Sequence, residues 1–413
     1  MNHTTVERAV KHPMPPAAHA VIILSRAYDD QYRETRDDNP VICTSAGKRT
    51  VLYQAIEAAI GEPIVLLSPQ PRGRGIAKPL LETTSRFGAQ TQLFSKASSV
   101  RKIRFLLDIA HYARHVAKHT STGDTLVIDN YELIYIIAVY YCRLLGRRNR
   151  ILLEYEDGKH LIDKGIWKWM SSLAEFLTKS LVEGSMLATP NLGKRLPTSI
   201  PKVVIPGILR DGIVPNPPPM SGEPVGFLYS GSLDKERGIP LLLDYLEYGN
   251  FPVDTVFHIT GQGHFVDRFE ALQARHPGVI HFHGSVSQKE LQRIRGLSHY
   301  GLNLQSSQNP ISEVTYPSKT FDYLNAGIRV ISTRAAGVEE VLGETAIYLQ
   351  HETPSALAEA IQTAVISLKT KDQTHQVHPL RRYSFAGTVD RIREMFIHAG
   401  LLELSVNEKT TIQ

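Results

Sequence analysis

NPISEVTYPSKTFDYLNAGIRVIST, residues 309–333, is the segment that reveals most about the fold of this chain. It predicts a loop, a short helix, a glycine stop and a buried strand. Pro317 suits the first helical turn, where no N–H is needed, and Gly327 suits the left-handed position just past the helix end. With about 3.6 residues per turn, the helix has a polar and an apolar side. The polar side carries Ser318, Lys319, Asp322 and Asn325, and the apolar side carries Phe321 and Leu324.

The polar side of this helix is suited to a nucleoside diphosphate. Free N–H groups at a helix start, with the hydroxyl of Ser318 and the ammonium group of Lys319, form a good seat for phosphate. Asp322 follows one turn later, where its carboxylate can accept hydrogen bonds from the paired hydroxyls of a ribose. One short element could therefore hold both parts of the ligand.

Charge and composition narrow the class of protein. The chain has 413 residues, enough for two domains, and is mildly basic, with a net charge of +5 and a pI of about 9.0. We interpret the basic clusters at 101–104 and 147–150 as solvated surface, with attraction to phosphates or anionic lipid head groups as the alternative. Because no basic stripe is interleaved with aromatic residues, we expect no nucleic acid partner.

Cysteine usage and hydropathy favour a cytoplasmic protein. Cys43 and Cys142 lie far apart, in no metal or redox spacing, which suits a reducing compartment. The N-terminus has no apolar core of a secretory signal. The longest apolar stretch, 133–145, is too short to cross a bilayer and is predicted to be a buried helix.

The first half of the chain alternates between strand and helix patterns. This alternation predicts a parallel sheet covered on both faces. The predicted strands are 21–25, 40–45, 62–68, 125–130 and 150–157, and the predicted helices are 48–60, 100–117 and 133–145.

A linker separates this half from a second one of the same kind. Residues 206–222 hold five prolines and three glycines and cannot form a regular element. Strand patterns then recur at 225–230, 254–261, 279–284, 300–305 and 328–333. We therefore expect two Rossmann-like α/β domains facing across a cleft, with ligands beyond the carboxyl ends of the strands. The predicted parts are a disordered N-terminus (1–19), two domains (20–205 and 223–380), the linker, a helix crossing back to the first domain (381–402) and a tail (403–413).

Two glycine-rich turns lie at one edge of the second sheet. In GSLDKERG, residues 231–238, Gly231 permits a tight turn while Ser232 and Arg237 are placed to contact phosphates. Gly261 and Gly263 form a second turn, for which a ligand-free role is about as well supported.

As a set, these motifs resemble the nucleotide-binding domain of the GT-B glycosyltransferases, of the type called family 4 or group 1. The resemblance covers about 225–350 strongly and 20–205 more loosely. It is carried by GSLDKERG (231–238), ITGQG (259–263), FHGSVSQKEL (282–291) and SEVTYPSKTFDYLNAGIRVIST (312–333), and YSFAGTVDRI (383–392) resembles the closing helix.

The resemblance implies roles for individual residues at the donor. Asp322 stands where a glutamate holds the ribose, and Glu313 stands where another contacts the donor sugar, with eight residues between them instead of seven. Arg237 matches the cation that neutralises the diphosphate, whereas Ser232 replaces what is often arginine. Donor contacts are also expected from Ser318, Lys319, Thr315, Gly231, Gly261 and Gly263.

The acceptor side is expected at the strand end LEYEDGKH, residues 153–160. Glu156 or Asp157 could hydrogen-bond the donor sugar or orient the acceptor, and His160 stands where many relatives place a histidine. Capping of the next helix is an equally supported role for the acid pair. Asn130, at the preceding strand end, is a weaker candidate.

An amphipathic helix is predicted at 163–182. Ile166, Trp169 and Phe176 belong to its apolar stripe. We favour a helix packed on its own domain over one that lies on a membrane surface, although Lys164 and Lys168 beside the tryptophans keep the second interpretation open.

The leading hypothesis is a retaining glycosyltransferase that uses a nucleotide diphosphate sugar, without a further cofactor. Since no DxD motif stands at a strand end, we expect no essential metal. The acceptor would be a glycan or a lipid-linked glycan in polysaccharide or glycoconjugate biosynthesis, reached at the inner face of the cell membrane. The alternatives are a sugar-nucleotide epimerase of the same fold and a non-catalytic binding subunit.

Overall fold

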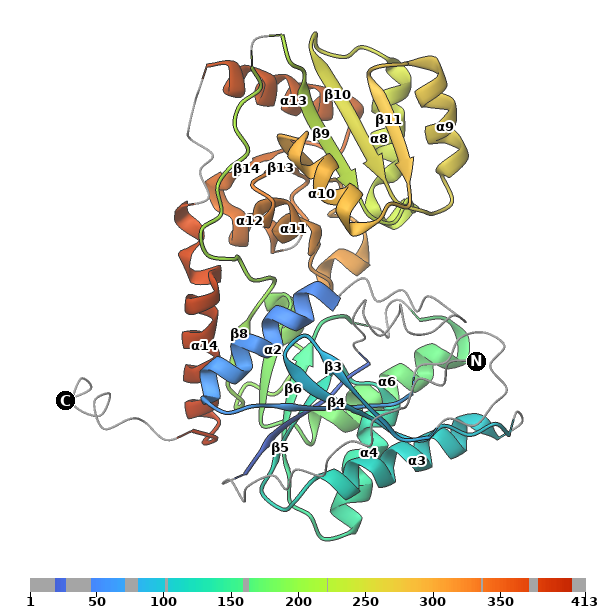
Figure 1. Ribbon diagram of the computed structural model, residues 1–413, viewed down its shortest axis with the longest axis vertical. Coiled ribbons are helices and arrows are strands. Elements are labelled where there is room, and N and C mark those ends of the chain that lie inside the picture. The colour runs from blue at the N-terminus through green and yellow to red at the C-terminus, as the bar shows by residue number, and fades with distance from the viewer. Residues whose placement is uncertain are drawn as a thin grey trace, which may run out of the picture.

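The computed structural model describes residues 19–26, 46–70, 81–100, 103–158, 163–220, 222–335, 337–370 and 378–402. These residues form two α/β domains, stacked one above the other in Figure 1. Figure 1 also shows strands β9, β10 and β11 of the upper domain ending toward the lower domain. The predicted strand 40–45 and His160 lie outside the described residues.

The N-terminal domain contains an eight-stranded sheet with the order β3-β4-β2-β1-β5-β6-β7-β8. All neighbours are parallel except the β3–β4 hairpin. The strands are β1 (Val21–Leu24), β2 (Val65–Ser68), β3 (Thr83–Phe87), β4 (Gln90–Phe94), β5 (Thr125–Asp129), β6 (Arg150–Tyr155), β7 (Gly184–Leu187) and β8 (Lys202–Val204). Its helices are α2 (Ala46–Ile60), α3 (Arg104–His119), α4 (Leu133–Leu144), α6 (Gly165–Lys179) and α7 (Pro190–Gly193).

The C-terminal domain contains a six-stranded parallel sheet with the order β11-β10-β9-β12-β13-β14. Its strands are β9 (Val225–Ser230), β10 (Thr255–Thr260), β11 (Ile280–Gly284), β12 (Tyr300–Asn303), β13 (Arg329–Ser332) and β14 (Ala346–Tyr348). The α-helices are α8 (Ile239–Tyr248), α9 (Val266–Arg275), α10 (Gln288–Gly296), α11 (Lys319–Asn325), α12 (Val338–Leu342), α13 (Pro354–Lys369) and α14 (Phe385–His398). Short 3-10 turns are η1 (Lys235–Arg237), η2 (Pro310–Glu313), η3 (Gly343–Thr345) and η4 (His378–Tyr383).

Helices cover both faces of the N-terminal sheet. On one face α4 packs against both α3 and α6, and on the other α2 packs against α14. Figure 1 shows α14 descending from the upper domain to lie beside α2 and β8. Arg391 of α14 donates to the Val204 carbonyl at 2.7 Å, and Arg393 donates to the Ala59 carbonyl at 3.1 Å. The C-terminal helix therefore ties the two domains together.

The proline-rich linker also contacts α11. The side chain of Asn325 accepts from the Arg210 backbone N–H at 2.8 Å and donates to the Ile208 carbonyl at 2.9 Å. The Asn216 N–H donates to the Gly327 carbonyl at 2.8 Å. The helix predicted to hold the nucleotide is thus fixed to the segment that joins the domains.

Three details differ from the sequence predictions. Helix α11 begins at Lys319, so Pro317 precedes the helix and is not in its first turn. The β3–β4 hairpin was not predicted, because β3 is a largely exposed edge strand without an apolar pattern. The packed interpretation of α6 is wrong for much of its stripe, since Ile166, Trp169 and Phe176 are exposed.

No helix within the described ranges combines the length and the apolar character that crossing a bilayer requires.

Candidate functional site

Glycine turns form the carboxyl edge of the C-terminal sheet. Gly231 follows β9 and its N–H donates to the Thr260 carbonyl at 3.0 Å. Gly261 follows β10 with a φ of +143°, and a Cβ there would lie 1.8 Å from the Gly231 carbonyl oxygen. Gly263 is equally confined, because its Cβ would lie 2.4 Å from the Leu233 carbonyl oxygen. Only glycine fits this close packing, which leaves a low backbone edge that a ligand can approach.

Lys319 reaches this edge from the first turn of α11. Its Nζ lies 4.0 Å from the centroid of the Tyr229 ring and would be 3.3 Å from a Cβ built on Gly231. Burial, followed by repulsion from Arg237, lowers the pKa of Lys319 to about 7. Among the described residues it forms no salt bridge. An anion placed here would meet an ammonium group that lacks a close counterion.

Arg237, in η1, is the second cation of this edge. Its Nη1 donates to the side-chain oxygen of Gln305 at 2.8 Å. The Gln305 amide in turn donates to Ser312 at 3.0 Å and to Thr315 at 3.4 Å. Thr315 is buried and its hydroxyl donates to the Ile311 carbonyl at 3.0 Å. The structure thus places Thr315 behind Arg237 as support, away from the open edge, and adds Gln305, which the sequence analysis missed.

Asp322 lies on the exposed side of α11, one turn after Lys319. The residue is exposed, but burial of its carboxyl group among the surrounding protein atoms raises the pKa, and the nearby charges of Arg295, Lys319 and Arg210 oppose this rise. Ser318 is exposed and its side chain forms no capping hydrogen bond. The polar side of α11 therefore presents a hydroxyl, a cation and an acid, as the sequence pattern predicts.

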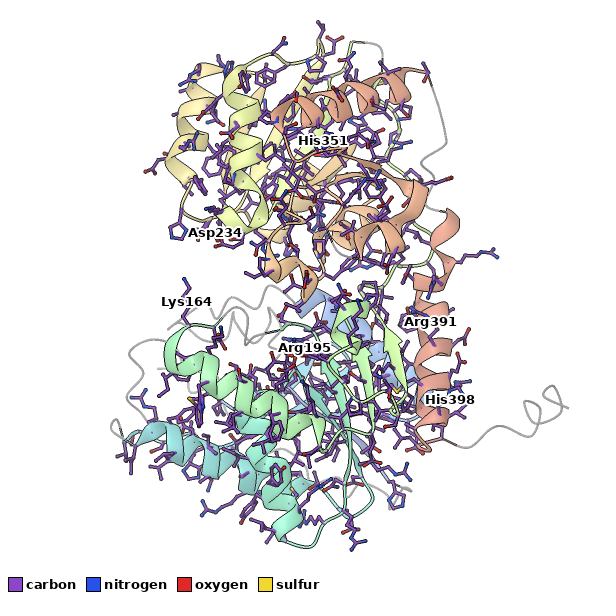
Figure 2. The ribbon with its side chains drawn as sticks, turned by 180° about the vertical axis from the view of Figure 1, so that it is seen from behind. Lys164, Arg195, Asp234, His351, Arg391 and His398 are labelled. Carbon is purple, nitrogen blue, oxygen red and sulfur yellow. The ribbon has the colours of Figure 1, made fainter. Side chains whose placement is uncertain are left out.

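Ser232 is engaged by a neighbour that the sequence analysis did not consider. Its hydroxyl donates to Asp234, which also lies 2.7 Å from Nδ1 of His264. These contacts, the Ser232 hydroxyl first, lower the pKa of Asp234. Figure 2 shows Asp234 on the edge of its domain that faces the N-terminal domain. A carboxylate thus stands where phosphate contacts were expected from Ser232.

Glu313 ends η2 and is exposed, close to the other domain. The next residue, Val314, accepts a hydrogen bond from the Gly158 N–H at 3.2 Å, and a Cβ on Gly158 would lie 2.7 Å from the Val314 side chain. This contact brings the segment of Glu313 against the strand end that carries Glu156 and Asp157.

The predicted acceptor residues are more constrained than the sequence suggests. Glu156 forms an ion pair with Lys48 of α2. Asn130 is buried with a φ of +59°, and its N–H donates to the Glu154 carbonyl at 2.7 Å. Asp157 is partly exposed and has further contacts of its own. Glu156 is therefore held by a cation.

A buried polar network lies next to these residues, and the sequence analysis did not predict it. Asp129 accepts from Arg49 at 2.7 Å and from Ser25 at 2.9 Å, and Tyr53 donates to Ser25 at 2.9 Å. Burial, followed by the charge of Asp129, raises the pKa of Glu154 to about 8. The residues come from β5, β6, α2 and the position just after β1, so no single sequence motif identifies them.

Within the described residues, no group of three or more His, Cys, Asp or Glu side chains is arranged to hold a metal ion.

Residues 224–366 match the family model described as Glycosyl transferases group 1. No curated protein matches the chain at a significant level.

The whole chain is similar in structure to several solved proteins of low sequence identity. Sucrose-phosphate synthase from Thermosynechococcus elongatus has 12% identity and a TM-score of 0.63, covering 92% of this chain and 98% of its own. The lipopolysaccharide outer core galactosyltransferase WaaB has 13% identity and a TM-score of 0.59, with coverage of 92% and 99%. Anabaena HepE in complex with UDP has 11% identity and a TM-score of 0.61, also with coverage of 92% and 99%.

These matches confirm the predicted fold class, two Rossmann-like domains in the GT-B arrangement, and the resemblance to group 1. The narrower assignment to family 4 stays a prediction. The chain has the GT-B fold, and residues 224–366 of its C-terminal domain match the glycosyltransferase group 1 family model.

Proposed function

We propose that this protein is a retaining glycosyltransferase that moves a hexosyl group from a nucleoside diphosphate sugar to a glycan or lipid-linked acceptor in polysaccharide or glycoconjugate biosynthesis. The observation that carries the proposal is the pair of cations, Lys319 and Arg237, at the glycine edge of the C-terminal sheet. The UDP bound by the Anabaena relative supports a nucleotide donor. The inner face of the cell membrane is the proposed place of action.

Catalysis would rest on stabilising the leaving diphosphate. As the bond between the sugar and the β-phosphate breaks, negative charge grows on the phosphate oxygens, and fixed cations stabilise that charge. Arg237 is held in place by Gln305, and Lys319 lies over the Tyr229 ring, so neither needs to reorganise. In a retaining transfer without a protein nucleophile, the acceptor hydroxyl attacks from the same side, and its proton passes to a phosphate oxygen.

The remaining roles belong to the same proposal. Asp322 would hold the ribose, Glu313 the hydroxyls of the donor sugar, and Glu156 or Asp157 the acceptor. Approach of the two domains would exclude water and favour transfer over hydrolysis. No metal or further cofactor enters this scheme, so activity should survive EDTA.

Thermal stabilisation against a panel of nucleoside diphosphates and their sugars tests the donor class. A nucleotide that binds only the folded state raises the melting temperature, and the stabilisation grows with the logarithm of its concentration relative to Kd. We expect one base to stand out. No stabilisation by any nucleotide would contradict the proposal. The selected nucleotide sugar should then be consumed together with an acceptor. Interconversion of the sugar without an acceptor would indicate an epimerase, and binding without turnover would indicate a binding subunit.

A further inference from the structure

Helix α6 exposes large apolar side chains that a solvated helix would bury. The exposed fractions are 70% for Ile166, 58% for Trp167, 66% for Trp169 and 71% for Phe176. Near the start of α3, Ile103, Phe105 and Leu106 are exposed as well. The chain has two tryptophans, and both are in this set. The residues from Lys164 to Trp169 are all exposed, so this end of α6 presents apolar side chains on more than one side of the helix, with Trp167 and Trp169 nearly opposite each other. We call these seven residues the aromatic face. Isolated exposed apolar residues are ordinary, but a group that includes every tryptophan of a protein indicates a contact surface.

The exposed charged side chains of α6 are of one sign. Lys164 and Lys168 are exposed at the start of α6. The single carboxylate within α6, Glu175, is buried and bound by Arg195 at 2.7 Å. Asp163, just before the helix, accepts a hydrogen bond from Ser171. The exposed part of α6 thus combines indole rings and ammonium groups without an exposed carboxylate.

The position of the face follows from the topology. Strand β4 runs parallel to β2, and β6 runs parallel to β5 and β7. Because α3 follows β4 and α6 follows β6, the first turns of both helices lie at the carboxyl edge of the N-terminal sheet. Both helices pack against α4 and belong to one layer. Figure 2 shows Lys164 on the edge of the N-terminal domain nearest the C-terminal domain. The face is therefore next to the side on which the acceptor is expected.

We propose that the aromatic face docks on an anionic phospholipid bilayer. Indole rings prefer the depth of the head groups, and lysines beside them pair with lipid phosphates. This charge complementarity selects an anionic membrane over a neutral one. The contact itself does not depend on the transferase activity, and only its use in reaching a lipid-linked acceptor rests on the proposed function.

Vesicle binding tests the proposal with the full chain. We expect co-sedimentation with vesicles of phosphatidylcholine and phosphatidylglycerol, little with phosphatidylcholine alone, and release by high salt. Because both tryptophans lie on the aromatic face, the emission should shift to the blue and be quenched by brominated lipids only on binding. The proposal would be overturned if the protein sedimented with neither type of vesicle, or if it bound vesicles without a change in tryptophan emission.

Variants separate this surface from the rest of the protein. Trp167→Ala with Trp169→Ala should lower vesicle partitioning by about tenfold or more, and Lys164→Glu with Lys168→Glu by roughly tenfold. Matched controls in the C-terminal domain are Tyr248→Ala with Val253→Ala, and Arg275→Glu with Lys289→Glu. All four residues are exposed, and these variants should bind like the wild type.

One further measurement tests whether a second copy of the chain covers the aromatic face, and another separates this proposal from the proposed function. If the face joins two copies of the chain, sedimentation velocity will show a wild-type dimer that the tryptophan variant dissolves, and vesicle binding will be absent. Nucleotide affinity, measured on the same variants by calorimetry, should be unchanged. Failure of vesicle binding with intact nucleotide binding refutes the docking surface alone, whereas failure of nucleotide binding in the wild type refutes the proposed function alone.

Discussion

Basic residues lie at the carboxyl edges of both sheets, but in the described part of the chain they pair with carboxylates at only one of the two edges. On the C-terminal domain, Lys319 and Arg237 lie at the edge, and neither forms a salt bridge among the described residues. On the N-terminal domain, Arg49 pairs with Asp129 at 2.7 Å and Lys48 pairs with Glu156. One edge therefore keeps cations available, and the other neutralises them internally.

This difference matches what each side would have to bind. A diphosphate brings its own negative charge, so a site for it gains by leaving cations without carboxylate partners. A sugar hydroxyl is neutral and needs oriented polar groups, which an internally paired network supplies without a strong net field. The comparison predicts that mutations at the two edges will damage different properties, catalysis at one and stability at the other.

The largest effect is expected at the carboxyl edge of the C-terminal sheet, where the donor is proposed to bind and which we call the donor edge. Arg237→Ala should lower turnover by about 10²–10³-fold, because removing one preorganised charge-stabilising group from such sites costs that much. Steady-state kinetics with the selected nucleotide sugar measures this loss. Lys235→Ala changes an exposed cation in the same turn and should leave turnover nearly unchanged. Near-normal rates for Arg237→Ala would show that the diphosphate is held elsewhere.

At the carboxyl edge of the N-terminal sheet, which we call the acceptor edge, mutations should mainly lower the free energy of unfolding. Arg49→Met leaves the buried carboxyl of Asp129 without its cation, and breaking such a pair typically costs about 3 kcal/mol. Urea unfolding followed by circular dichroism measures this loss, because both tryptophans are already exposed in the folded protein and their fluorescence would change little. Arg143→Met, on the exposed end of α4, is the control and should change little. A loss below about 1 kcal/mol for Arg49→Met would mean that water solvates Asp129 well.

The two edges also differ in how far the sequence predicts them. At the donor edge, Gly231, Lys319 and Asp322 lie within short motifs whose spacing specifies a turn or a helix face, and the structure brings the turn and helix together. At the acceptor edge, Asp129, Glu154 and Arg49 come from separate elements, and each is unremarkable in its own segment. A network assembled by tertiary packing has no local pattern.

Helix α6 shows a second limit of sequence patterns. Periodicity identifies which residues share a side of a helix but not what that side contacts, so Trp169 and Phe176 were assigned to the interior although they are exposed. Ser232 shows a third limit, because its partner Asp234 captures the hydroxyl that was expected to contact phosphate. The fold was accessible from the pattern, whereas the partner of each polar group required the structure.

The charge of Lys319 gives the next prediction, a pH dependence of nucleotide binding. In the free protein its pKa is about 7, below the ordinary value of 10.5, so the amine is increasingly neutral above that pH. A bound diphosphate favours the ammonium form and raises this pKa, so binding above pH 7 takes up a proton. Affinity should therefore fall roughly tenfold between about pH 7 and pH 9.

Calorimetry in buffers of different ionisation enthalpy measures this proton uptake directly. Lys319→Arg keeps the charge at all accessible pH values and should remove both the uptake and the fall in affinity. A wild-type affinity that is constant over this range, with no proton exchanged, would show that Lys319 is already charged in the free site.

The smallest effect is expected from Asp322, whose proposed ribose contact involves neutral hydroxyls at an exposed position. Asp322→Ala should weaken the nucleotide and its sugar alike by about fivefold, in line with roughly 1 kcal/mol for one hydrogen-bonding group. A 2′-deoxy nucleotide sharpens the test, because wild-type protein should lose affinity for it while Asp322→Ala should not distinguish it from the ribose form. Asp322→Glu should retain the preference for ribose, since the longer acid is the residue that the resemblance predicts. If Asp322→Ala binds both ligands as the wild type does, the carboxylate serves Arg295 and Arg210 near the linker instead, and the donor edge holds its ligand by the phosphates alone.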